Sequence, residues 1–359
     1  MTAMVTGGSA TFDPVKTPYA LAEAEFPRGG DLREQLEFLL RYVILAPSTH
    51  NTQPWKFALT DDGIEVYADY ARRMPVADPG GRELIMSIGA AIFTLRVAAS
   101  HYGIDCRVDY DYSGASDRPV AVVQCAASAG HGPLDQELEP LFAVIPRRHT
   151  NRNAFLISRL PQSVVQVFAA LPHGSQAALA VSADGVLIER VAELVAEADR
   201  RQLSDPEFRK DVAEWMRPNW TERPDGIPGA SLGVKGVSSA LAPWATRVLD
   251  LGRVRAAADR NLCREAPGLI VVQSEDSLPH WLEAGELLDR ILLTIVREGL
   301  QVSYFNMPIQ VPELRLELRR LLGLHSWPQA LLRMGYSLIE PLPTPRRPVE
   351  NVLIQTHVH

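Results

Sequence analysis

Two stretches of this 359-residue chain share one spacing of glycines, and this repeat limits the folds open to the chain. The first stretch runs from Gly89 to Gly103 and the second from Gly285 to Gly299. In each, apolar residues at helical spacing lead to a glycine that can end a helix, and a strand-like segment follows. Two unrelated amphipathic helices could share this spacing by chance. A duplicated unit, with two similar halves packed as an intramolecular pseudo-dimer, explains the helix and the following strand together.

The remaining periodicity predicts an α+β fold. Asp31 and Glu34 have the spacing of a capping box, and apolar residues recur at helical spacing until Pro47 ends the pattern. We expect an N-terminal extension over residues 1–30, a first half over residues 31–140 and a second half over residues 141–359. Further helices are expected at residues 82–102, 186–198 and 281–298, and strands at residues 64–69, 106–112, 119–125 and 268–273.

Composition is typical of a globular protein of the cytoplasm. Hydrophobic residues make up 46% of the chain, and a formal net charge of −7 argues against nucleic acid or a membrane surface as partner. Residues 1–12 lack the features of a signal peptide, and no apolar run approaches the roughly 18 residues of a membrane helix. Cys106, Cys125 and Cys263 form neither a disulfide framework nor a CxxC metal site, so we expect core cysteines in a reducing compartment.

Residues 46–57 concentrate hydroxyl groups, amides, two prolines and a tryptophan. Pro47 and Pro54 each fix a backbone angle, so the loop holds Ser48, Asn51 and Gln53 with little conformational freedom left to lose. Such a loop can cradle a ligand at the end of a helix. The simpler interpretation is a helix-to-strand connection in which short polar side chains satisfy local turn bonds.

Two cationic clusters are candidates for the rest of such a site. The first includes Arg148, Thr150 and Arg152, and the second is Arg346 with Arg347. Guanidinium groups are planar, permanently charged donors that suit phosphate. As runs of charge alone, both clusters are more often solvated surface.

The segment between the two halves of the pattern, residues 215–244, is rich in proline and glycine and shows no clear periodicity. Segments of this length without regular structure are typically lids, binding loops or disordered. Three tryptophans, Trp215, Trp220 and Trp244, argue against disorder. We therefore expect a lid-like insertion over about residues 204–250.

Together these patterns resemble the FMN-dependent nitroreductases, and among them the single-chain, internally duplicated Acg-type members. The resemblance rests on P-S-x-x-N-x-Q-P-W at residues 47–55, R-x-[ST]-x-R at residues 148–152, and the run 331–336 with residues 346–348. A weaker match at residues 306–310 corresponds to a loop that family members place under the flavin ring. The resemblance spans about residues 30–350 and implies a nitroreductase-like fold.

In ordinary members the FMN lies at a homodimer interface and is bound by both subunits. This chain carries one such set, because residues 28–31 replace the R-x-[ST]-x-R of the first half and the second half has no P-S-x-x-N-x-Q. The resemblance thus implies one FMN per chain, held between the halves of a monomer, and leaves further homodimerisation open. The residues implied to bind FMN are Ser48, Asn51, Gln53, Arg148, Thr150, Arg152, Pro308, Ile309, Gln310, Arg346 and Arg347.

The resemblance also implies roles for the cationic clusters. Arg148, with Arg346 or Arg347, would neutralise the phosphate, and Thr150 would bond to the phosphate or the ribityl chain. Arg152 would lie near flavin N1 and the C2 carbonyl, where a cation stabilises the negative charge of the reduced ring.

The remaining implied contacts lie around the ring. The loop at residues 48–53 would hold the ribityl chain and the ring edge, and backbone amides at Ile309 or Gln310 would reach N5. Gln310 stands where the family has an acidic residue. Neither a catalytic acid or base nor a metal is implied.

The implied activity is NAD(P)H-dependent reduction of a small-molecule acceptor, a nitroaromatic or a quinone. The alternative is a catalytically silent FMN-storage protein, in which the lid-like insertion covers the flavin and excludes NAD(P)H. Two other motifs are weaker. Residues 229–233 match the GxSxG of serine hydrolases but lack the strand that should precede it, and His357 with His359 would bind a metal only adventitiously, in a frayed tail.

Overall fold

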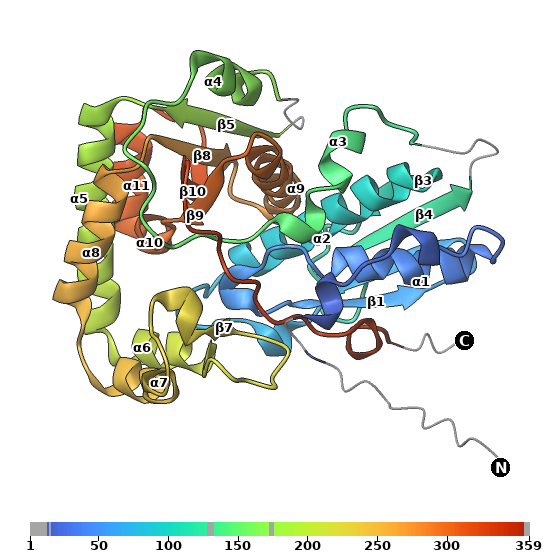
Figure 1. The fold of residues 1–359 in the computed structure, drawn as a ribbon, viewed down its shortest axis with the longest axis horizontal. Coiled ribbons are helices and arrows are strands. Elements are labelled where there is room, and N and C mark those ends of the chain that lie inside the picture. The colour runs from blue at the N-terminus through green and yellow to red at the C-terminus, as the bar shows by residue number, and fades with distance from the viewer. Residues whose placement is uncertain (1–12, 14–15, 128–132, 172–175, 355–359) are drawn as a thin grey trace, which may run out of the picture.

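Each half of the molecule is built on a four-stranded antiparallel sheet, as Figure 1 shows. The computed structural model describes residue 13 and residues 16–127, 133–171 and 176–354, so His357 and His359 lie outside the described residues. The predicted capping box is present, because Asp31 Oδ1 accepts the backbone N–H of Glu34 over 2.9 Å. The first sheet has the order β1-β2-β4-β3. The elements of this half are α1 (Leu32–Val43), β1 (Trp55–Leu59), β2 (Gly63–Ala68), α2 (Arg82–His101), β3 (Ile104–Tyr110), β4 (Ala121–Ala127) and α3 (Glu139–Phe142).

The second half repeats this sheet, with the order β5-β8-β10-β9. In both halves one long helix follows the second strand of the sheet and ends at a glycine of positive φ, Gly103 at 74° and Gly299 at 72°. The predicted α+β fold of two similar halves is therefore confirmed. The elements are α4 (Gln162–Ala169), β5 (Ala177–Ser182), β8 (Gly268–Ser274), α9 (Leu278–Arg297), β9 (Gln301–Tyr304), α10 (Met307–Gln310), α11 (Pro312–Leu321) and β10 (Trp327–Gly335).

Helices α2 and α9 pack against each other at the centre of the molecule and cross at two glycines (Figure 1). A Cβ added to Gly89 would lie 2.1 Å from the carbonyl oxygen of Leu282, and one added to Gly285 would lie 2.1 Å from that of Met86. The backbones approach so closely because glycine has no side chain. The repeated glycines thus mark the axis that relates the two halves.

Two segments pass from one half to the other. In the first crossing segment (residues 143–152), the backbone N–H of Asn151 donates to Val302 O of β9 over 2.8 Å. In the second crossing segment (residues 340–354), Val352 O accepts the N–H of Phe57 in β1, also over 2.8 Å. The crossing segments therefore add backbone pairing between halves that already share a helical core.

An insertion, here called the insert (residues 185–264), separates β5 from β8, where the first half has only a short turn between β1 and β2. It runs along the side of the second half and then below it toward the first half (Figure 1). Its elements are α5 (Gly185–Ser204), α6 (Pro206–Glu214), β6 (Met216–Arg217), β7 (Ile227–Pro228), α7 (Ser238–Val248) and α8 (Gly252–Arg264).

The segment expected to lack regular structure is partly regular. Helix α7 begins at Ser238, β6 pairs with β7, and Trp215 is buried, whereas Trp220 and Trp244 are exposed. The GxSxG motif follows the two-residue strand β7, contrary to the expectation of no preceding strand. It forms a 3-10 turn, and Ser231 Oγ has no hydrogen-bond partner among the described residues. No base is therefore placed to activate this serine.

Two further expectations change. Helix α2 is, by length and composition, apolar enough to cross a membrane, although the sequence pattern suggested no such run; 89% of its most apolar window is buried inside the protein, as in a core helix. Cys106 and Cys125 are distant in sequence, yet they face each other across β3 and β4. Cys125 and Cys263 are buried as expected, and Cys106 is partly exposed.

Candidate functional site

A cavity of about 710 Å³ lies where the two halves, the crossing segments and the insert meet. The first half contributes residues 47–51 and four residues of α2, namely Glu83, Met86, Ser87 and Ala90. The crossing segments contribute residues 148–150, Arg152, Thr344 and Arg346. The second half contributes Leu288, residues 303–307, Gln310 and Arg333, and much of the remaining wall comes from α5, α6, α7 and α8 of the insert. Because four separate parts of the chain build it, this cavity exists only in the folded, fused molecule.

The loop after α1 is held in an unusual backbone conformation. His50, Asn51 and Gln53 have φ values of 48°, 57° and 51°, in the left-handed region that costs a non-glycine residue free energy. Ser48 Oγ accepts the N–H of Gln53 over 2.9 Å, and Thr49 Oγ1 donates to Glu83 over 2.9 Å. Local hydrogen bonds and the contact with α2 therefore fix the loop against the cavity.

Arg148 and Arg346 come from different crossing segments and meet at one carbonyl oxygen. Both donate to Leu45 O, over 3.2 Å and 3.3 Å, and Arg346 Nη1 also donates to Asn51 Oδ1 over 2.9 Å. Burial, with the nearby charge of Arg148, lowers the pKa of Arg346 to about 10. Arg346 Nε has no partner, and neither guanidinium forms an ion pair within the described part of the chain. Burial raises the pKa of the Asp289 carboxyl to about 6, and the charge of Arg148 lies near enough to oppose that rise. Two buried guanidiniums held together with no ion pair among the described residues suit an anionic ligand.

Arg152 lines the same cavity and has no hydrogen bond or ion pair to any described residue. Burial, together with the charge of Arg255, lowers the pKa of this guanidinium to about 10. Tyr304 and Asp259 lie near enough to oppose that shift. Arg152 is thus a second position in the wall where a negative ligand atom would be stabilised.

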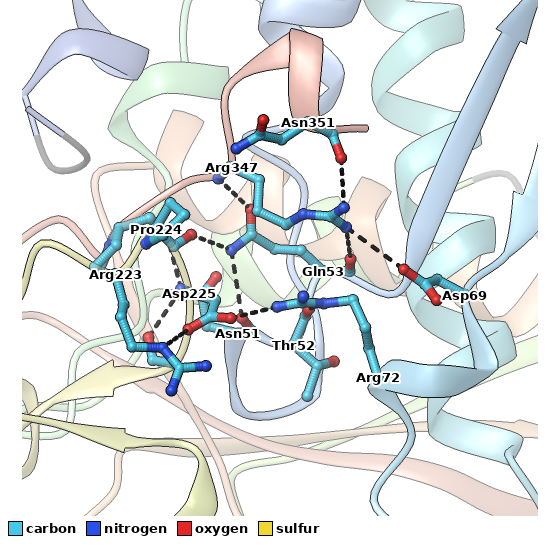
Figure 2. Close-up of polar contacts among 12 residues, drawn as sticks. Asn51, Thr52, Gln53, Asp69, Arg72, Arg223, Pro224, Asp225, Arg347 and Asn351 are labelled. Carbon is cyan, nitrogen blue, oxygen red and sulfur yellow. Dashed lines mark hydrogen bonds and ion pairs between the residues drawn. The ribbon is translucent and has the colours of Figure 1, made fainter. Parts of the chain in front are cut away.

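The loop that begins the site also fastens the insert, as Figure 2 shows. Asn51 Nδ2 donates to Gly226 O over 2.9 Å, and the N–H of Gly226 donates back to Asn51 O over 3.2 Å. Gln53 Nε2 donates to Pro224 O over 2.8 Å. These contacts join residues 51–53 to residues 224–226. We define the latch as these contacts together with the ion pairs of Asp225.

The Asp225 carboxylate is the ionic part of the latch (Figure 2). It is 5% exposed and binds Arg72 Nη2 over 2.5 Å and Arg217 Nη2 over 2.7 Å. Burial alone would raise the pKa of Asp225, but the hydrogen bonds from Arg217 and Arg72 outweigh burial and hold that pKa below its ordinary value. The Asp225 carboxylate thus links Arg72 of the first half to Arg217 of the insert.

No family profile matches the chain, but it is similar over most of its length to curated proteins. It is 29% identical over 330 residues to the Mycobacterium tuberculosis protein named "Putative NAD(P)H nitroreductase Rv3131", covering 89% of this chain and 91% of that protein. It is 28% identical over 325 residues to "Putative NAD(P)H nitroreductase acg" of the same species, covering 86% and 91%. The resemblance to the Acg-type nitroreductases is confirmed. Among solved structures, the FMN-dependent nitroreductase NfnB from Mycobacterium smegmatis aligns with 59% of this chain and 96% of that chain, at 13% identity and a TM-score of 0.38.

The structure brings seven of the residues implied by the nitroreductase resemblance to the cavity wall. From the first half come Ser48 and Asn51, and Gln310 comes from α10. The crossing segments supply Arg148, Thr150, Arg152 and Arg346. The two arginine clusters and the P-S-x-x-N loop, far apart in sequence, therefore share one cavity.

Gln53 and Arg347 are outside the cavity wall. Gln53 is fully buried, and its Oε1 accepts the N–H of Arg347 over 2.8 Å. Arg347 Nη1 donates to Gln53 O over 3.0 Å, and its Nη2 donates to Asn351 O over 2.6 Å. These two residues join the second crossing segment to the loop (Figure 2), so of the two adjacent arginines only Arg346 reaches the cavity.

The loop at residues 306–310 differs from the arrangement that the resemblance implied. Pro308 and Ile309 are buried in α10 and do not line the cavity. The N–H groups of Ile309 and Gln310 both donate to Asn306 O, over 2.8 Å and 3.2 Å, so neither backbone amide is left free to reach a ring nitrogen. The Gln310 side chain faces the cavity, where it donates to Glu83 over 2.9 Å and accepts from Gln202 over 2.8 Å.

Several cavity residues were missed in the sequence. Arg333 is 1% exposed on β10, and Asp199 and Asp259 are buried on α5 and α8. Arg255 precedes Asp259 by one helical turn, and this i, i+4 spacing was the one available signal. Arg333 could not be distinguished from a surface arginine, because only the packing of β10 against the crossing segment buries it.

Proposed function

We propose that the chain binds one FMN in this cavity and uses it as an NAD(P)H-dependent reductase of nitroaromatics or quinones. The observation that carries the proposal is the pair Arg148 and Arg346, two buried cations that form no ion pair with a described residue and meet at Leu45 O beside the P-S-x-x-N loop. The names of the mycobacterial relatives support the same activity. The proposal includes a cytoplasmic protein that carries one site per chain.

The residues present fit such a cofactor. A volume of about 710 Å³ lies within the range of small-molecule sites. Arg148 and the orphaned Nε of Arg346 would bind the phosphate, and Thr150 on the same segment would add a hydroxyl donor. Asn51 would act indirectly, because its amide is already bonded to Gly226, Pro345 and Arg346. It therefore positions Arg346 rather than contacting the ribityl chain.

FMN, when bound, would supply the hydride chemistry, and the chain would supply binding and electrostatics. Arg152 would stabilise negative charge at the pyrimidine edge of the ring. Ser48 Oγ accepts one backbone N–H and keeps its own proton to donate to the ligand. Met86 and the apolar side chains of α7 would exclude water from the reacting face.

One observation favours the alternative, an FMN-storage protein. The insert lines one side of the cavity and is fastened to the first half by the latch, and in a storage protein this fastened insert would keep NAD(P)H from the flavin. Anaerobic addition of NADPH separates the two functions. Bleaching of the flavin band supports a reductase, and persistent colour supports storage. A colourless protein that cannot be reconstituted with FMN would contradict both.

Arg148→Ala tests the site itself, and Arg147→Ala is the matched control, because Arg147 is exposed and does not line the cavity. A hydrogen bond to a charged group contributes about 1.5–3 kcal/mol, so Arg148→Ala should weaken FMN binding by roughly ten-fold or more. Arg147→Ala should bind as the parent does. Titration should end at one FMN per chain, and a ratio near two would overturn the single-site proposal.

A further inference from the structure

The insert adds to the cavity a compartment for which the first half has no counterpart. Four helices contribute to its wall: α5 with Leu203, α6 with Phe208, α7 with Leu241 and Ala245, and α8 with Leu262. In the first half, only a short turn joins the corresponding strands β1 and β2. This compartment, here called the insert compartment, is therefore an addition to the duplicated fold and not part of its symmetry.

One corner of the insert compartment is cationic. Arg333 is 1% exposed, and its Nε and Nη1 have no hydrogen-bond partner among the described residues. Its Nη2 donates to Asn153 O over 2.8 Å, and its guanidinium lies 4.1 Å from the ring centroid of Phe155. Arg333 is thus fixed in place with two donors unused. Arg152, also without a partner, and Arg255 lie near enough to lower its pKa.

The acidic groups of the corner do not balance these cations. Asp259 Oδ2 binds Arg255 Nε over 2.6 Å, which accounts for one pair. Asp199 lies beside Asp259, and burial, with the charge of Asp259, raises the pKa of Asp199 to about 8. Burial and the neighbouring carboxylate thus disfavour a second negative charge in this corner. The side chain of Arg255 is 44% exposed and is paired with Asp259, so the uncompensated charge of the corner is that of Arg333, which is buried, and Arg152, which is partly buried. A buried positive charge is costly without an anion.

We propose that the insert compartment binds an aromatic or other apolar molecule that carries one carboxylate, with the carboxylate between Arg152, Arg255 and Arg333 and the apolar body against α7. The proposed phosphate position at Arg148 and Arg346 uses other arginines. Of the three arginines of the corner, only Arg152 is also assigned to the flavin, at the edge of its ring, so Arg255 and Arg333 are the cations that belong to the carboxylate alone. The inference rests on the proposed function only in regarding this molecule as the electron acceptor. The binding itself needs no flavin chemistry.

The experiment compares two probes of nearly equal size, 4-nitrobenzoate and its methyl ester. Their dissociation constants are measured by calorimetry on the full chain. The carboxylate should bind at least about ten-fold more tightly than the ester, which is the effect of one charge-assisted hydrogen bond. Arg255→Gln should remove most of this preference without weakening the ester, and Arg255→Lys should restore part of it.

Arg253→Gln is the matched control, since Arg253 lies on the same helix, is exposed and does not line the cavity. It should leave both dissociation constants unchanged. Equal binding of the two probes, or an equal loss of both in Arg255→Gln, would overturn the inference. So would a loss of FMN affinity in Arg255→Gln, because the corner would then hold the phosphate.

The outcomes also separate this inference from the proposed function. If the chain binds FMN but shows no preference for the carboxylate, the inference fails and the proposed function stands. If the chain binds no FMN but retains an Arg255-dependent preference for the carboxylate, the inference stands and the proposed function fails.

Discussion

Replacement of either crossing glycine by alanine should force the two halves apart. In Gly89→Ala the new methyl group would lie 2.1 Å from Leu282 O, and in Gly285→Ala it would lie 2.1 Å from Met86 O. Ordinary contacts of this kind are about 3.5 Å, so each contact must lengthen by roughly 1.4 Å, and the helices must separate at the crossing. Neither oxygen can yield separately, because each belongs to the backbone of the opposite helix.

The magnitude follows from two opposing effects. Overpacking of a well-packed core costs about 1–3 kcal/mol. Replacing glycine by alanine within a helix returns about 0.5–1 kcal/mol, because the unfolded chain loses conformational freedom. We expect a net loss of about 1–2 kcal/mol in the free energy of unfolding for each variant. The double variant should lose less than the sum, since one separation of the helices accommodates both methyl groups.

Guanidinium chloride unfolding, followed by tryptophan fluorescence, measures these changes. Gly185→Ala is the control, because Gly185 begins α5 and has no heavy atom within 4 Å of the added Cβ. FMN affinity provides a second readout, since Met86 lines the cavity and lies one turn from Gly89. The reasoning is refuted if Gly89→Ala unfolds like the control, or if the two substitutions are fully additive.

Two further predictions concern the latch and the cavity histidines. Arg72→Met removes an ion pair of Asp225 and should loosen the insert, so NADPH should bleach bound FMN faster in stopped-flow measurements; an unchanged rate would show that the insert does not limit access. Burial lowers the pKa of His50 to about 4 and that of His149 to about 3. Because the unfolded chain takes up these protons near pH 6.5, the folded state should lose stability as the pH falls from about 6.5 to 4, and His50→Gln should reduce that loss in urea titrations at each pH.

The duplication could be predicted because its signal is local. A glycine that ends a helix and a glycine at a helix crossing are both required by backbone geometry, so they recur in both halves at the same spacing. Strand β1 was missed because it follows directly on the polar loop and because its residues do not alternate between apolar and polar. The strand is buried along almost all of its length, so such alternation is not required. Helix α7 was missed because Pro243 lies inside it. Helix α7 packs against α6 and β6, and these tertiary contacts cannot be predicted from local periodicity.

In the candidate site, too, features with a local sequence pattern were predicted and features that depend on tertiary structure were not. Arg148 and Asn51 were found because their residue types and spacing follow a pattern. The sequence could not predict which of two adjacent arginines faces the cavity. Arg346 and Arg347 are the same residue type, and only the path of the second crossing segment decides which side chain points to the cavity. The expectation of a free backbone amide at Ile309 was wrong, because the N–H groups of Ile309 and Gln310 both donate to Asn306 O within a helical turn. The sequence pattern did not indicate this turn. Sequence patterns therefore predict the chemistry of a site better than its orientation.

The proposal of a single site per chain is supported by a difference between the two halves. The sheets are equivalent, but the crossing segments are not: the first pairs with β9 and the second with β1, whose counterpart in the other half is β5. Only the loop before β1 therefore receives an arginine from the second crossing segment, and Arg346 bonds there to Asn51. Following β5, the chain instead extends into the insert, which turns its helices toward that same cavity. The duplication thus explains why the two halves are alike, whereas the different pairing of the two crossing segments leaves one proposed phosphate position. We therefore expect titration to end at one FMN per chain.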